Sequence, residues 1–241
     1  MKKRALAVAL CLFAAVPAAR AADMTDLLKA VPLPAVTGPA QDSATVASGL
    51  KEALAVGTKN AVGLLSKTDG YFGNEAVKIL LPENVRRVGD ALRMAGYQKE
   101  VDAFILSMNR AAEKAAPKAA DIFAGAIREM SIADAQKILN GGNTAATEYF
   151  KSKTSKQLFE AFKPDIAQSM NEVGVTKAYK AMTDRYTALM PFAKAESLDL
   201  DRYVTNKSLD GLFYMVGQEE TKIRTNPAAR TTELLKKVFA K

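Results

Sequence analysis

Four polar residues crowd the stretch SMNRAAEKAAPKAADIF, immediately before its proline. They are Asn109, Arg110, Glu113 and Lys114. Arg110 and Glu113 are three residues apart and Asn109 and Glu113 are four apart, so on a helix these side chains can meet. Glu113, beside a carbonyl that Pro117 leaves unbonded, could bind a cation, or act as an acid if it is buried. The alternative is a solvated, salt-bridged helix face, which contributes little energy.

A second polar cluster lies in QEETKIRTNPAARTTELLKK, close to the end of the chain. Its basic members are Lys222, Arg224, Arg230, Lys236 and Lys237. Asn226 and Pro227 predict the cap and first turn of a final helix, and a helix N-terminus attracts anions. This cluster could contact phosphate or carboxylate groups of a lipid or glycan. The alternative is helix capping with scattered surface charge, because glutamates are interleaved.

Two shorter motifs carry weaker signals. Asp199 and Asp201 in LDLD resemble part of an oxygen cluster for calcium, but the spacing fits no complete metal loop, so no metal site is predicted. The stretch TDGYFGN could be a binding loop around Asp69 and Tyr71. Ordinary turn chemistry explains its Asp, Gly and Asn equally well, and both interpretations stay open.

The absences in the composition exclude several kinds of chemistry. The chain contains no His and no Trp, and its single cysteine is Cys11. Ser-His-Asp and Cys-His nucleophilic machinery is therefore excluded, as are His- or Cys-ligated zinc, copper, haem and iron–sulfur sites. Carboxylate chemistry, lysine chemistry, an all-oxygen metal site or binding without catalysis remain. No cofactor is expected.

Residues 1–21, MKKRALAVALCLFAAVPAARA, have the three-part pattern of a secretory signal. A basic start precedes an apolar run that falls short of the roughly 20 residues of a spanning helix. We expect cleavage between Ala21 and Ala22 and a periplasmic protein without a transmembrane segment. Cleavage would remove Cys11 and four basic residues, leaving 30 basic and 26 acidic residues and a net charge near +4. This mild excess suits anionic surfaces, and nucleic acid is not expected as a partner.

The rest of the chain predicts an all-α protein. Residues 22–42 predict a short helix and a Pro-rich linker, and residues 43–241 a single helical domain, with about eight to ten helices in total, some kinked at Pro. An apolar stripe from Phe104 to Ile127 keeps helical spacing across Pro117, which predicts one bent helix.

Three further helix features are predicted from the sequence. Thr154 or Ser155 is expected to cap a new helix in which Pro164 makes a second bend. Thr205 is expected to start another helix. That helix is apolar nearly all round at LFYMV, which predicts a central, buried position.

Several of these motifs resemble a known family. GLKEAL, KTDGYFGN, SMNRAAEKAAPKA, VGVTKAY and above all LDGLFYMVGQEETKIRTNPAARTTELLKKVF are similar to a bacterial family catalogued as domain of unknown function 4197. The resemblance covers about residues 43–240. It implies a secreted, helical, single-domain protein, and it implies no activity and no catalytic residues.

Three functions are compatible with these observations. The first, which we favour, is a secreted or periplasmic non-enzymatic binding protein, with an apolar core or cavity and a basic rim, for a lipid or another anionic component of the cell envelope. The second is a hydrolase or lyase of envelope glycan that works through carboxylates, with Glu113 and Glu148 as the first suspects. The third is a structural partner of another envelope protein.

Overall fold

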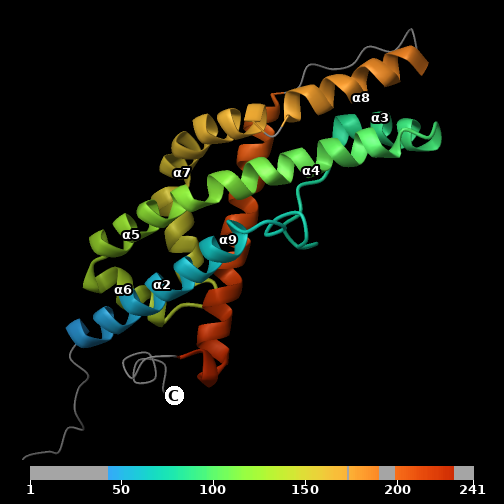
Figure 1. Ribbon diagram of the computed structural model, residues 1–241. Helices are drawn as coiled ribbons and strands as arrows, with labels where there is room; N and C mark the ends of the chain where they lie inside the picture. The colour runs from blue at the N-terminus through green and yellow to red at the C-terminus, as the bar shows by residue number, and fades with distance from the viewer. Residues whose placement is uncertain (1–42, 173, 190–198, 231–241) are drawn as a thin grey trace, which may run out of the picture. The chain divides into compact units, whose positions relative to one another are not determined.

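The computed structural model of the protein describes residues 43–172, 174–189 and 199–230. This part of the chain consists of helices, turns and loops and contains no strand (Figure 1). The α-helices are α2 (Ser43–Leu65), α3 (Glu83–Met94), α4 (Gln98–Ala115), α5 (Ala119–Glu129), α6 (Ile132–Leu139), α7 (Ala145–Glu172), α8 (Val175–Leu189) and α9 (Leu200–Thr225), and short 3₁₀ turns form η1 (Ala116–Lys118) and η2 (Pro227–Ala229). The predicted signal, the linker and most of the predicted final helix lie outside the described residues.

The bend predicted at Pro117 is confirmed. Pro117 has no N–H to donate to the carbonyl of Glu113, and the chain tightens there into η1 between α4 and α5. The two helices follow one another as one bent segment in Figure 1. Counted this way, the described part has seven helices, so the predicted number of eight to ten is slightly too high.

Two predicted helix starts are wrong for the same physical reason. Thr154 and Ser155 lie inside α7, where their hydroxyls donate to the carbonyls of Phe150 and Lys151, at 2.7 and 2.6 Å, instead of capping a new helix. The hydroxyl of Thr205 likewise donates to the carbonyl of Asp201, inside α9. Hydroxyl side chains can cap a helix or bond back to its preceding turn, and the sequence alone does not separate the two.

Asp199, and not Thr205, is the N-terminal cap of α9. Its carboxylate accepts a hydrogen bond of 2.9 Å from the backbone N–H of Arg202, and α9 begins at Leu200. A capping box starts α6, in which Ser131 and Asp134 each bond the other's backbone N–H at 3.1 Å.

The core forms where α9 crosses the other helices. α9 packs against α7 and α2, and α4 packs against α7 and α8 (Figure 1). Phe123 lies with its ring centroid 5.0 Å from that of Phe150 and 6.2 Å from that of Phe213, which joins α5, α7 and α9. The apolar stripe predicted from Phe104 to Ile127 is buried. Among the helices described, none combines the length and apolar character that a membrane crossing needs.

Candidate functional site

The polar residues before Pro117 hold a loop. The Glu113 side chain is 5% exposed. One of its carboxylate oxygens accepts the backbone N–H groups of Tyr71 and Phe72, both at 3.1 Å. Asn109 is fully buried and bonds both the N–H and the carbonyl of Ile79, each at 2.8 Å. The loop between α2 and α3 is therefore held onto α4 by two side chains of that helix.

Arg110 completes this arrangement. It donates to the second Glu113 oxygen at 2.6 Å and to Asp69 at 2.8 Å. The hydrogen bond with Glu113, the largest cause, and the one with Asp69 raise the pKa of Arg110. Lys114 points elsewhere and pairs with the exposed Glu172 at 2.9 Å, which lowers the pKa of Glu172. The predicted contact between Arg110 and Glu113 exists, whereas Asn109 and Glu113 bond different parts of the loop.

The loop residue Tyr71 is fully buried, so it is not available to a ligand in solution. Its hydroxyl donates to the carbonyl of Ser208 in α9 at 2.7 Å. Burial, and secondarily the negative charge of Glu113, raise the pKa of Tyr71 far above its ordinary value. The stretch TDGYFGN thus connects α4 to α9 through the interior.

The C-terminal basic residues are also engaged within the protein. Arg224 pairs with Glu220 at 2.9 Å and donates to the carbonyl of Ile138 at 2.8 Å. Arg230 bonds the carbonyls of Ile223 and Arg224 near the end of α9, at 3.1 and 2.9 Å. Lys222 lies 3.4 Å from Glu219. The structure brings Arg224 and Arg230 close together, but their guanidinium groups bond carboxylate and carbonyl oxygens of the protein.

Glu220, which the sequence analysis did not single out, caps α7. Its carboxylate accepts the backbone N–H of Ala146 at 2.9 Å and both the N–H and the hydroxyl of Thr147 at 2.8 Å. A helix N-terminus leaves such N–H groups without intrahelical partners, and a carboxylate there is also favoured by the helix dipole. Glu220 and Glu113 therefore both accept backbone N–H groups from a distant segment, and each is paired with an arginine.

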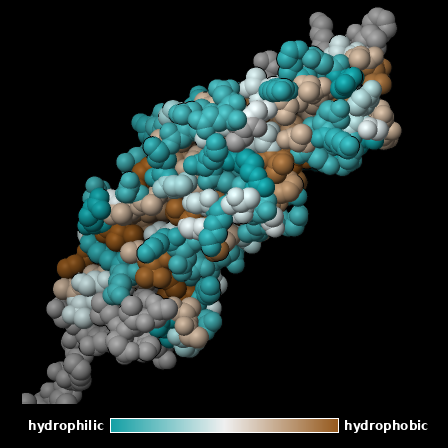
Figure 2. Space-filling model, viewed as in Figure 1, coloured by the Kyte–Doolittle hydropathy of each residue, from teal (hydrophilic) through white to brown (hydrophobic). Residues whose placement is uncertain are grey.

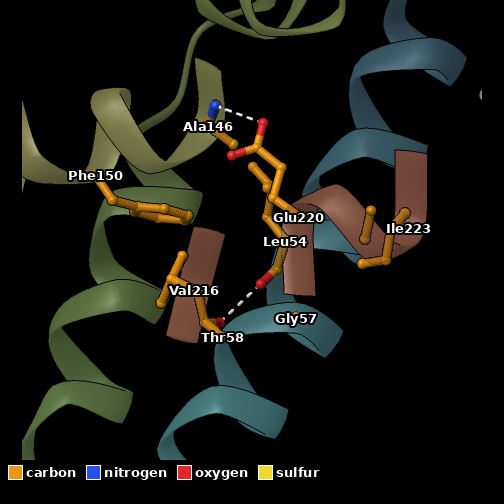
Figure 3. Close-up of a pocket in the computed structure, with 9 residues that line it drawn as sticks. Leu54, Gly57, Thr58, Ala146, Phe150, Val216, Glu220 and Ile223 are labelled. Atoms are coloured by element: carbon orange, nitrogen blue, oxygen red, sulfur yellow. Dashed lines mark hydrogen bonds between the residues drawn. The ribbon is translucent and has the colours of Figure 1, made fainter. Parts of the chain in front are cut away.

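The interior beside Glu220 has little free space. Figure 3 shows a narrow slot between α2, α7 and α9, with the Glu220 carboxylate beside the backbone nitrogen of Ala146. The slot is lined by Leu54, Gly57, Ala146, Val216 and Ile223 together with Glu220. Its volume is about 10 Å³, which is the space of one water molecule and not of an acyl chain. Among the described residues, every buried side-chain nitrogen and oxygen has a hydrogen-bond partner.

Larger hollows flank the first half of α7. One of about 560 Å³ lies between α6 and α7, and one of about 370 Å³ lies between α5 and α7. Tyr149 and Lys153 line both. Figure 2 shows apolar side chains interrupting the polar surface near the end of the bundle where α2, α5 and α6 lie. The larger hollow falls within the range of roughly 300–1,000 Å³ that is usual for ligand sites, so we take it as the candidate site.

The α6–α7 hollow combines an apolar floor with charged groups. Ile138, Ala145 and the half-buried Tyr149 supply apolar surface, and the exposed Lys137 and Lys153 stand at the rim. The Lys153 ammonium lies 5.9 Å from the centroid of the Tyr149 ring.

The Asp134 carboxylate of this hollow is already used by the capping box. Hydrogen bonds from Ser131 hold the pKa of Asp134 below its usual value, and the positive charges of Lys153 and Lys137 contribute less. Burial, followed by the negative charge of Asp134, raises the pKa of Tyr149. Neither lysine is in an ion pair with another described residue.

The other predicted acidic residues occupy simple positions. Glu148 is 65% exposed and lies 3.5 Å from Lys151, where it borders the α6–α7 hollow. Asp199 is the cap of α9. In the part of the chain that the structure describes, no three His, Cys, Asp or Glu side chains are grouped so as to hold a metal ion.

The described fold is thus an all-helical bundle with ligand-sized hollows around one helix. A family model described as "Protein of unknown function (DUF4197)" matches residues 40–240, and the chain belongs to this family. No curated protein and no solved structure matches the chain.

Sequence reasoning missed Tyr149, Lys137 and Lys153 as site residues. Each is separated from the others by four residues or more, and the hollow exists only because the turn after α6 brings α7 back beside it. A half-buried tyrosine that is followed four residues later by a lysine is common on amphipathic helices. The motif AATEYFKSK therefore carries no distinctive signal.

Proposed function

We propose that this protein is a non-enzymatic binding protein for an anionic amphiphile, such as a fatty acid or another lipid of the cell envelope. The observation that carries the proposal is the 560 Å³ hollow between α6 and α7, with its apolar floor and two rim lysines. The apolar part of the ligand lies over Ile138, Ala145 and Tyr149. The anionic group lies between Lys137 and Lys153. No cofactor is needed.

The competing function, a carboxylate-dependent glycan hydrolase or lyase, is not supported by the surroundings of Glu113. Both Glu113 oxygens already accept hydrogen bonds from Tyr71, Phe72 and Arg110, and the side chain is 5% exposed. A general acid must reach its substrate within hydrogen-bond distance. Glu148 borders two hollows, but its side chain is 65% exposed and lies 3.5 Å from Lys151, so it does not lie in a desolvated cleft.

The location of the protein is part of the same proposal. The N-terminal signal pattern supports export, and a periplasmic protein would meet envelope lipids directly. Mass spectrometry of the protein from a periplasmic extract should give a chain that begins at Ala22. A retained Met1 in that fraction would contradict the proposed cleavage.

Laurate is the probe for the binding test, measured by isothermal titration calorimetry below its micellar concentration. Dodecyltrimethylammonium, with the same tail and the opposite charge, should bind much more weakly. We expect Lys137→Ala/Lys153→Ala to weaken laurate binding about 30-fold, since each ammonium contributes roughly 1 kcal/mol at about 4 Å in water. The matched control is Lys156→Ala/Lys163→Ala, which removes two exposed α7 lysines that do not line the hollow.

Two outcomes would overturn the proposal. One is equal binding of the two probes, because the rim charges would then play no part. The other is equal weakening in the two double variants, because the effect would then reflect net charge and not the hollow.

A further inference from the structure

A third hollow, of about 340 Å³, lies on another side of α7, between this helix and α9. Asp210, Tyr214 and Gln218 follow one another at intervals of four residues and form its α9 wall. Thr144, Glu148 and Lys151 form the opposite wall. The α7–α9 hollow is therefore a groove between two facing helix stripes.

The floor of the α7–α9 hollow is buried and held in place. It consists of Phe213, Gly217 and Thr147. The Thr147 hydroxyl donates to the buried Glu220 carboxylate at 2.8 Å, so this part of the floor belongs to the cap of α7. A floor fixed by the core gives the two walls a constant separation, which a preformed binding site requires.

Tyr214 stands out from its neighbours in α9. The run LFYMV is apolar nearly all round and predicts a buried position, yet Tyr214 is 45% exposed, whereas Leu212 and Phe213 are 0% and 5% exposed. The prediction is wrong at this position because the groove keeps the ring in contact with solvent. An exposed aromatic ring with a polar tip is a frequent element of recognition sites.

The polar groups of the walls are mixed and nearly neutral. Asp210 lies 3.2 Å from Lys207, and Glu148 lies 3.5 Å from Lys151. The amide of Gln218 and the hydroxyl of Thr221 can each donate and accept hydrogen bonds. This chemistry does not select an anion, because both carboxylates and both lysines are paired. It suits a neutral ligand with many hydroxyl groups.

We propose that the α7–α9 hollow binds a short neutral oligosaccharide. One sugar ring lies with its C–H face on Tyr214, and its hydroxyls bond the side chains of Asp210, Gln218 and Glu148. This site is distinct from the α6–α7 hollow, although Glu148 borders both.

The test is saturation-transfer NMR on the full chain with maltotriose and with triacetylchitotriose as probes. We expect saturation to reach the sugar ring protons of at least one probe. Tyr214→Ala should weaken binding of that probe about tenfold through loss of the ring contact, while Tyr214→Phe should keep it within about threefold. Tyr214 is half exposed, so both variants should keep the circular dichroism of the parent protein.

Transfer that appears in the parent protein, persists in Tyr214→Phe and fails in Tyr214→Ala supports the proposal. It is overturned if neither saccharide shows transfer, or if transfer is the same in Tyr214→Ala as in the parent. Lys137→Ala/Lys153→Ala should leave saccharide binding unchanged and weaken only laurate, which separates a failure of this site from a failure of the α6–α7 hollow. Loss of saccharide binding in that double variant would also overturn the assignment.

Discussion

Replacing Glu220 by Gln tests whether a buried carboxylate holds α7 to α9. The amide oxygen of Gln can still accept the N–H and hydroxyl of Thr147. Its NH₂ group then faces the N–H of Ala146 and the guanidinium of Arg224, which are all donors. The variant therefore loses the ion pair at 2.9 Å and the hydrogen bond at 2.9 Å from Ala146.

The magnitude follows from burial, because the Glu220 and Arg224 side chains are only 5% and 10% exposed. Removing one partner of a buried ion pair costs about 3–5 kcal/mol. For a domain of this size each kcal/mol lowers Tm by about 2–4 °C, so we expect Tm to fall by about 6–20 °C. Urea denaturation followed by circular dichroism gives the change in the free energy of unfolding.

Glu148→Gln is the matched control. It also changes a carboxylate to an amide in the first turn of α7, but at a side chain that is 65% exposed. It should therefore change the free energy of unfolding by no more than about 0.5 kcal/mol. Hydrogen exchange adds a local readout, since the amides of Ala146 and Thr147 should lose protection in Glu220→Gln. The reasoning is refuted if Glu220→Gln and Glu148→Gln have the same stability within 1 kcal/mol.

Two further predictions concern the interior around Tyr71. A Cβ added at Gly211 would lie 2.8 Å from the Tyr71 ring, so Gly211→Ala should destabilise the protein by about 1–3 kcal/mol. At Gly63 in α2 an added Cβ would meet nothing within 4 Å beyond the adjoining backbone of its own helix, so Gly63→Ala should stabilise the protein by up to about 1 kcal/mol. Urea midpoints test both variants, and a reversed order would contradict the packing. Because burial raises the pKa of Tyr71, the folded protein keeps a phenol proton that the unfolded chain releases above pH about 10. The contribution of Tyr71 to stability should therefore be constant below that pH and fall as pH rises further. Tyr71→Phe should flatten this alkaline decline in denaturation curves at pH 9, 10 and 11, and an unchanged slope would remove Tyr71 as its source.

The bent helix and the capping box were predictable because their causes are local. The apolar stripe around Pro117 has helical spacing, and Ser131 with Asp134 needs only its own backbone. The pair of Arg110 and Glu113 was also predictable, since three residues separate them on one helix. In each case the signal lies within two turns of the chain.

The burial of Glu113 was not predictable, because its partners come from a distant segment. Tyr71 and Phe72 approach from a loop 42 and 41 residues earlier, and nothing in the spacing of charges shows that the loop folds over α4. The solvated salt-bridged face was a reasonable expectation from sequence, and tertiary packing replaced it. The candidate hollow depends in the same way on how α6 and α7 meet.

The cap that Glu220 gives to α7 also has a consequence for the order of events during synthesis. Ala146 and Glu220 are 74 residues apart, so the ribosome makes the start of α7 long before it makes its cap. At about 5–20 residues per second, the first turn of α7 is without this carboxylate for roughly 4–15 s. α9 carries Glu220 and the Ser208 carbonyl that accepts the hydrogen bond of the Tyr71 hydroxyl. The earlier helices can therefore reach their final arrangement only after α9 has been synthesised.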